Sequence, residues 1–159
     1  MTTVLPLLAV RIPGRPHGQG SMNLYAVNGH AHGDYPEQTK SYRNTVVDQL
    51  RAEWNSAPPH PGPVHVRATA WMPRPAHHWL PANSRRTFPA LRPGAPQQCC
   101  ISPDLDKICR LTGDALQAAA VLRDDRQICH WTTSRRWAGH YDDPGSLTIA
   151  LDAIPTDRP

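Results

Sequence analysis

The chain has 159 residues and a formal net charge of +4 with an isoelectric point near 9.1, which suit one domain with an ordinary core and a polyanionic partner. The positive charge comes from 15 Arg and only 2 Lys, and the planar Arg side chain suits phosphate groups well. The four cysteines form no Cys-x-x-Cys pair, so we expect neither a disulfide scaffold nor structural zinc. No apolar run is long enough to cross a membrane, and no secretory leader pattern opens the sequence. We therefore expect a cytoplasmic protein.

The first strand and the first loop are predicted before residue 22. Residues 4–12 are apolar, with β-branched residues at both ends, and stop at Pro13-Gly14, so they predict a strand. Residues 15–21 form a basic, Gly-rich loop that lacks the Gly-Lys-Ser/Thr ending of a phosphate-binding P-loop. The sequence therefore predicts a flexible basic loop after the first strand.

A hairpin, a helix and a strand follow. Two short apolar runs flank Asn28-Gly29, and because both of these residues tolerate positive φ, they predict a β-hairpin. Residues 39–54 carry apolar side chains at helical spacing. Residues 64–72 alternate apolar with more polar residues, as a half-buried strand does.

Residues 73–102 are rich in Pro and Arg and show little periodicity. We expect a long loop inserted into the domain, and disorder is the simplest interpretation because this composition buries little apolar surface. A connection of nearly thirty residues without structure is unusual in a compact domain, and such segments are generally functional or disordered.

The last third of the chain predicts a helix and two strands. Ser102 and Pro103 are typical of an N-cap and a first helical residue, and apolar residues recur at helical spacing from about residue 104 to residue 120. Gly113 costs this helix about 1 kcal/mol relative to Ala, so we expect a packing or functional reason for it. Residues 128–137 and 146–151 close the chain as strands, and the element order predicts an α+β fold with a small mixed β-sheet and two main helices.

Five of the 13 acidic residues fall within 22 positions of this basic chain. They are Asp104, Asp106, Asp114, Asp124 and Asp125. Carboxylates one residue apart, with an acidic pair about twenty residues later, are oxygen donors that suit a hard divalent cation. Capping of the helix start explains one of them without a metal. A ladder of salt bridges spaced by four residues, through Arg110, is a second metal-free explanation.

The distance along the helix limits how such a site can form. A helix of about 16 residues spans about 24 Å. Asp125 therefore meets Asp104 and Asp106 only if the chain folds back after the helix or if a partner subunit supplies it.

The stretch from Pro103 to Ile128 resembles the signature of the RusA-type Holliday-junction resolvases. It reads Pro-Asp-Leu-Asp, Asp-Ala-Leu and Asp-Asp-Arg-Gln-Ile, where the family reads Pro-Asp-x-Asp-Asn, a Lys four positions after the second Asp, Asp-Ala-Leu and Asp-Asp-x-Gln-Val/Ile, with the same gaps. Residues 13–21 are also similar to the Pro-Gly-x-Pro-x-x-Gln-Gly-Ser run of many phage and prophage members. Between these blocks the likeness is weak.

By this resemblance Asp104, Asp106 and Asp125 bind Mg²⁺, and the protein has a RusA-like fold and acts as a homodimer on four-way DNA junctions. The chain departs from the family at two positions, because Lys107 replaces the Asn and Arg110 replaces the Lys. Arg110 neutralises a phosphate but, with a pKa above about 12, it cannot deliver a proton. If the family's Lys acts as an acid, Lys107 or a metal-bound water takes that role here, and if it only stabilises charge, Arg110 suffices.

The expected function is a Mg²⁺-dependent endodeoxyribonuclease that resolves Holliday junctions by paired strand cleavage. The bound Mg²⁺ would activate a water and neutralise charge on the leaving oxygen, and two symmetry-related sites of a dimer would cut two opposed strands. The insertion at 73–102 is a further candidate for touching DNA. The basic residues expected to contact phosphates, with an affinity that falls as salt rises, are Lys40, Arg43, Arg74, Arg85, Arg86, Arg135 and Arg136.

Three other interpretations stay open. A junction-binding protein whose acidic patch has lost catalysis would bind branched DNA without cutting it. A general metal-dependent endonuclease would cut duplex and junction equally. In a small phage structural or regulatory protein the acidic residues would only solvate a helix, and this interpretation predicts no affinity for DNA.

Overall fold

The structure is a computed structural model, and it describes residues 6–20, 22–83, 85 and 88–155. Strands β4 and β7 have the bounds that the sequence predicts, and the other main elements differ from prediction by a few residues at their ends. In chain order the elements are β1 (Leu8–Pro13), β2 (Asn23–Val27), β3 (His30–Asp34), α1 (Glu37–Trp54), β4 (Val64–Met72), the 3₁₀ helix η1 (Ala76–His78), β5 (Trp79–Leu80), β6 (Ala90–Leu91), α2 (Leu105–Ala118), the 3₁₀ helix η2 (Asp125–Gln127), β7 (Ile128–Trp137) and β8 (Ser146–Ala153).

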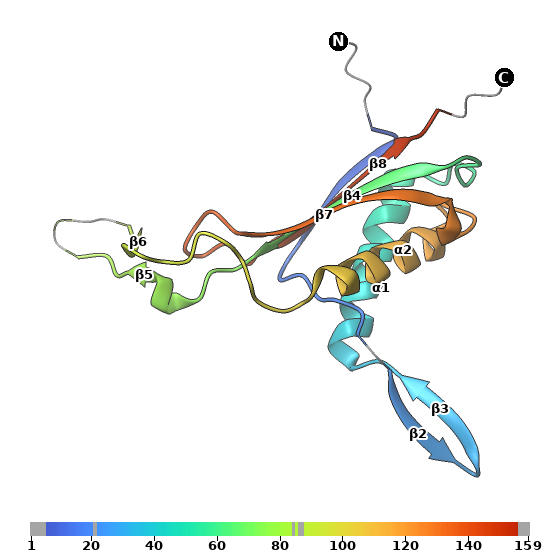
Figure 1. Cartoon of the computed structure of the whole chain (residues 1–159), viewed down its shortest axis with the longest axis horizontal. Helices are drawn as coiled ribbons and strands as arrows, with labels where there is room; N and C mark the ends of the chain where they lie inside the picture. The colour runs from blue at the N-terminus through green and yellow to red at the C-terminus, as the bar shows by residue number, and fades with distance from the viewer. Residues whose placement is uncertain (1–5, 21, 84, 86–87, 156–159) are drawn as a thin grey trace.

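The central sheet has four strands in the order β1-β8-β4-β7. Strands β4 and β7 are parallel, and the other two pairings are antiparallel. Both main helices lie on the same side of this sheet (Figure 1). The predicted α+β fold, with a small mixed sheet and two main helices, is therefore confirmed.

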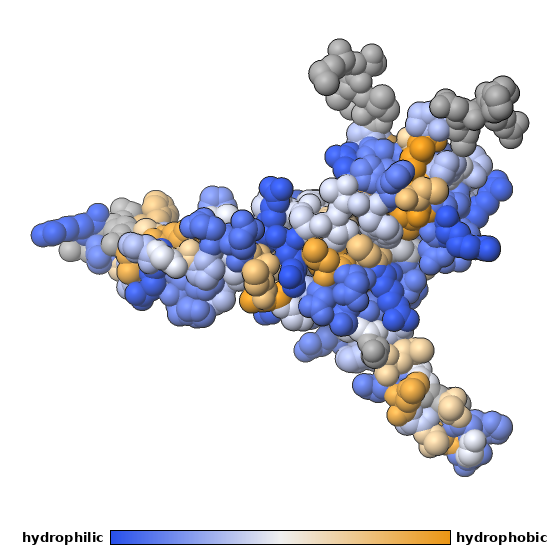
Figure 2. Space-filling model, in the orientation of Figure 1, coloured by the Kyte–Doolittle hydropathy of each residue, from blue (hydrophilic) through white to orange (hydrophobic). Residues whose placement is uncertain are grey.

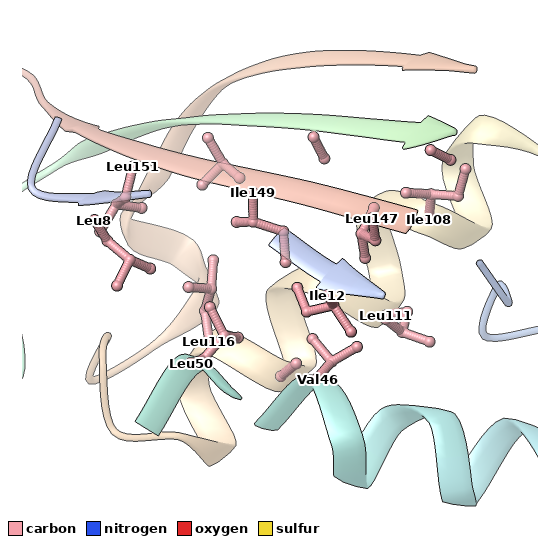
Figure 3. Close-up of a cluster of buried hydrophobic side chains, with 14 of the residues drawn as sticks. Leu8, Ile12, Val46, Leu50, Ile108, Leu111, Leu116, Leu147, Ile149 and Leu151 are labelled. Atoms are coloured by element: carbon pink, nitrogen blue, oxygen red, sulfur yellow. The ribbon is translucent and has the colours of Figure 1, made fainter. Parts of the chain in front are cut away.

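The alternation of residues in β4 decides which face of the sheet is covered. Val64, Val66, Ala68, Ala70 and Met72 are fully buried. Their neighbours along the strand point to the other face, because successive strand residues alternate. The covered face packs on α1 and α2 through large buried side chains (Figure 3), which include Ile12, Leu50, Ile108, Leu111, Leu116, Leu147, Ile149 and Leu151.

Two arms leave this body at different places (Figure 1). One is the β2–β3 hairpin, whose turn residues Asn28 and Gly29 both have positive φ, as the sequence predicts. Its surface carries exposed apolar side chains, including Leu24 at 79% exposure (Figure 2). The other arm holds β5 and β6, which pair with each other.

The expectation of an unstructured loop at 73–102 is wrong for the described part of that segment. It contains η1, β5 and β6, and it is fastened to the body by aromatic side chains. The indole Nε1 of Trp137 donates to the carbonyl of Gln98 at 3.1 Å, and the Arg74 guanidinium lies 5.2 Å from the centre of the Trp137 ring. The segment is ordered because these contacts join residues far apart in sequence, where composition alone does not reveal them.

The ends of two predicted elements, α2 and β1, also need correction. Helix α2 begins at Leu105 with Asp104 as its N-cap, so Ser102 is not the cap and Pro103 lies outside the helix. The helix ends at Ala118 rather than at residue 120. Strand β1 begins at Leu8, and residues 4 and 5 of the predicted strand lie outside the described residues.

Within the described residues, no helix is both long enough and apolar enough to cross a membrane.

Candidate metal and DNA site

Asp104 stands at the start of α2 with its carboxylate available. It is the N-cap residue, but its side chain makes no capping hydrogen bond, and it is 66% exposed. Lys107 Nζ lies 3.3 Å from Asp104 Oδ2, and Arg135 Nη1 lies 4.0 Å from Asp104 Oδ1. A capping hydrogen bond therefore does not account for this carboxylate, which has two cations beside it instead.

Arg135 connects the edge strand β7 to the start of α2. Its side chain is only 19% exposed. Its Nη1 donates to the carbonyls of Ile101 at 2.6 Å and Pro103 at 2.9 Å. Arg135, which the sequence suggested as a phosphate contact, thus binds the backbone of its own chain and fixes the position of Asp104 relative to β7.

Asp106 and Asp125 lie along one side of α2. A Cβ atom built on Gly113 would lie 3.9 Å from the Cβ of Asp125, so the chain does fold back onto its own helix after α2. Asp106 precedes Gly113 by seven residues, which places both on one helical face about 10 Å apart along the axis. The segment that folds back after α2 therefore brings Asp125 next to the middle of the helix. It does not bring Asp125 next to the start of the helix.

This spacing bears directly on the metal site. Among the residues that the structure describes, no three His, Cys, Asp or Glu side chains are grouped closely enough to hold a metal ion. Asp104, Asp106 and Asp125 are all exposed at the surface. Their assignment as metal ligands stays a prediction, and in one protomer they do not form a complete metal-binding site.

The segment that carries Asp125 is held by its neighbours in sequence. Asp124 accepts hydrogen bonds from Arg126, and these lower the pKa of Asp124 to about 2. Gln127 Oε1 accepts from the backbone N–H groups of Arg123 and Asp124, and its Nε2 donates to two backbone carbonyls of the segment before β4. Asp124 and Gln127 therefore fix η2, and Asp125 is left exposed between them.

Sequence reasoning missed these two positioning roles. Asp124 and Gln127 form a capping box, in which each side chain bonds the backbone at the other's position. The signal was present, because an acidic residue followed three positions later by Gln before an apolar run is the pattern of this motif.

Asp114 faces the Gly-rich loop instead of the other acidic residues. Gln19, which is 3% exposed, donates through Nε2 to Asp114 Oδ2 and to the hydroxyl of Tyr35. In the described part of the chain Arg110 is exposed and forms no ion pair with Asp106 or Asp114. The salt-bridge ladder considered from the spacing is therefore not formed.

The same loop packs closely on the start of α2. The backbone N–H of Gln19 donates to the carbonyl of Lys107 at 3.0 Å. A Cβ atom on Gly18 would lie 2.6 Å from the Cβ of Pro103 and 2.7 Å from the Cβ of Lys107. Only glycine fits at this approach, so the loop and the Asp-x-Asp segment form one structural unit.

A large groove opens beside this unit. It has a volume of about 1140 Å³ and lies between the loop, the start of α1 and the start of α2. Arg15, His17 and Lys107 line it. Burial, and secondarily Arg15, lower the pKa of His17, which favours the neutral imidazole. Because Lys107 also contacts Asp104, the groove lies beside this one candidate metal ligand.

The predicted phosphate contacts on α1 have different surroundings. Lys40 Nζ lies 2.6 Å from Asp34 Oδ2, and this hydrogen bond raises the pKa of Lys40 and lowers that of Asp34. Arg43 lines a smaller cavity of about 410 Å³ together with Gln19 and Asp114. Lys40 is thus paired within the chain, whereas Arg43 borders an open space near the loop.

The remaining predicted contacts lie along the sheet edge and the β5–β6 arm. Arg74 stacks on Trp137, and the Arg136 guanidinium lies 5.8 Å from the centre of the Trp71 ring. Arg85 is exposed on the arm, and Arg86 lies outside the described residues. DNA contact by any of these residues stays a prediction.

Comparison with known proteins identifies a family. A protein-family model described as Endodeoxyribonuclease RusA matches residues 13–148. This span includes the Gly-rich loop, all five clustered acidic residues and the β5–β6 arm. No curated protein matches the chain.

Proposed function

The chain belongs to the RusA endodeoxyribonuclease family, and we propose that it is a Mg²⁺-dependent nuclease that resolves four-way DNA junctions as a homodimer. Family membership implies a junction endonuclease, and nucleases of this family are typically metal-dependent. The observation that carries the proposal is the exposed Asp104 carboxylate, which makes no capping bond and contacts Lys107, a residue that lines the adjacent groove together with Arg15 and Glu37.

The carboxylates have the chemistry that Mg²⁺ prefers, since they are hard oxygen donors exposed to water. We infer that Asp104, Asp106 and Asp125 hold the ion. When bound, Mg²⁺ supplies positive charge that activates a water and stabilises charge on the phosphate. Asp125 lies beside Gly113, and Gly113 is about two helical turns away from Asp106. This separation supports a site that is completed by a second copy of the chain.

Lys107 and Arg110 divide the role of the single Lys that the family carries. We propose that Lys107, whose Nζ lies 3.3 Å from Asp104 Oδ2, contacts the scissile phosphate and donates a proton to the leaving oxygen. Arg110 is exposed on the next turn of α2, and its permanently charged guanidinium neutralises phosphate without giving up a proton.

The groove lined by Arg15, His17 and Lys107 is the path for the DNA backbone toward the carboxylates. Arg and Lys side chains bind phosphates and release counterions, so affinity falls as salt rises. His17, whose pKa is lowered by burial and by Arg15, adds a hydrogen-bonding group to this groove.

The test compares cleavage of a labelled four-way junction and of matched duplex, with Mg²⁺ and with EDTA. We expect the wild type to cut the junction only with Mg²⁺, and Asp104→Asn to bind the junction without cutting it. Asp48→Asn is the matched control, because Asp48 is an exposed acid on α1 paired with Arg51. Equal nicking of duplex would indicate a general endonuclease, and binding without cleavage by the wild type would indicate an inactive junction-binding protein.

A further inference from the structure

The β5–β6 arm is a second positively charged region, separate from the candidate carboxylate site. Residues 73–103 contain four Arg and no Asp or Glu. The arm projects from the end of the sheet where β4 and β7 finish (Figure 1). A segment with this charge attracts a polyanion.

An aromatic cavity lies where the arm meets the loop between β7 and β8. Its volume is about 260 Å³, and its lining includes Trp79, Phe88, Pro89, His140, Tyr141 and Asp142. The Trp79 and Tyr141 rings are nearly perpendicular, with centroids 5.8 Å apart. Phe88 is 77% exposed and Tyr141 is 52% exposed. Large aromatic faces are therefore open to a ligand at this place.

The polar groups of the cavity favour a flat heteroaromatic ligand over a phosphate. The polar side chains of the lining include His140 and Asp142. The exposed carboxylate of Asp142 repels phosphate but accepts hydrogen bonds from N–H groups. The edges of unpaired nucleobases, thymine included, present both acceptors and N–H donors.

Cations beside the cavity suit the phosphates that flank such a base. Arg92 Nε donates to the carbonyl of Trp79 at 3.0 Å, which holds this exposed side chain next to the cavity. Arg85 is also exposed on the arm. The arrangement combines aromatic faces for stacking with cations for the backbone, which is how proteins bind single-stranded nucleic acid.

We propose that this cavity binds an unpaired nucleobase of the DNA substrate, stacked on Phe88 and Tyr141. The identity of the polyanion as DNA rests on the proposed function. The cavity adds a recognition site for unpaired bases, which are the least costly bases to take out of a stack.

The test measures binding of fluorescein-labelled twelve-residue oligothymidylate in EDTA by fluorescence anisotropy. We expect Phe88→Ala to weaken binding roughly 5- to 150-fold, the range for loss of one stacked base. Phe88→Leu should be similarly weak because leucine cannot stack, whereas Asp48→Asn, a change of an exposed acid on α1 that is not part of the cavity lining, should bind like the wild type. An abasic oligonucleotide of the same length reports the phosphate contacts alone and should not distinguish these variants.

Several outcomes would overturn the proposal. They are no binding of oligothymidylate by the wild type, unchanged binding by Phe88→Ala, and an equal loss for the abasic oligonucleotide. A change of Phe88→Ala from dimer to monomer in sedimentation, with oligothymidylate affinity retained, would assign the cavity to contact between copies. Circular dichroism checks that each variant is folded.

Junction cleavage by the wild type separates this inference from the proposed function. If the wild type cuts the junction and Phe88→Ala binds oligothymidylate normally, only the base site is wrong. If the wild type does not cut but binding depends on Phe88, the base site stands and the nuclease proposal fails.

Discussion

At Gly18 a single absent methyl group allows the loop to approach α2. A Cβ atom there would come within 2.7 Å of Pro103 and Lys107 side-chain atoms, so we expect Gly18→Ala to destabilise the protein by about 1–3 kcal/mol, as overpacking does. Gly20→Ala is the control, because its Cβ would meet only Lys107 Cε at 3.8 Å. Urea unfolding measures both variants, and equal stabilities would contradict the close approach.

Single residues also show what the sequence could reveal about the site. The Asp-x-Asp spacing pointed to Asp104 and Asp106, and their exposure agrees with availability for a ligand. The sequence could not reveal that Arg135 binds the carbonyls of Ile101 and Pro103, because that contact joins residues more than thirty positions apart. It also could not assign Asp114 to Gln19, which depends on how the loop packs.

Among the elements, α2 contains an internal glycine, Gly113, and the space around it predicts how an alanine there would change stability. A Cβ on Gly113 would find Ile128, Trp131 and Asp125 at 3.7–3.9 Å, which is ordinary van der Waals contact. We therefore expect Gly113→Ala to raise the free energy of unfolding by about 1 kcal/mol through helix propensity. Thermal unfolding measures the change, and a loss of stability would show that α2 and β7 pack too closely for a methyl group.

The elements that were predicted well have strong local patterns. β4 alternates buried and less buried residues along its whole length, and the β2–β3 turn has Asn-Gly chemistry. The arm strands β5 and β6 have only two residues each, too few for a periodicity to be visible. The start of α2 was placed too early because Arg135 holds the carbonyls of Ile101 and Pro103 outside the helix.

For the whole molecule, the central question is whether one chain or two build each proposed metal site. We expect that mixing Asp104→Asn protein with Asp125→Asn protein restores cleavage, because a mixed dimer with sites shared between subunits keeps one unmutated site. Junction nicking by the mixture, compared with each variant alone, measures this. A mixture as inactive as its components would show that each chain completes its own site.

The hydrogen bonds of Arg135 to the backbone before α2 also link the two regions that we propose to contact DNA. Its strand, β7, runs on to Trp137, against which Arg74 of the arm is stacked. Through Trp137 and Arg135, one strand therefore joins the arm to the backbone that positions Asp104.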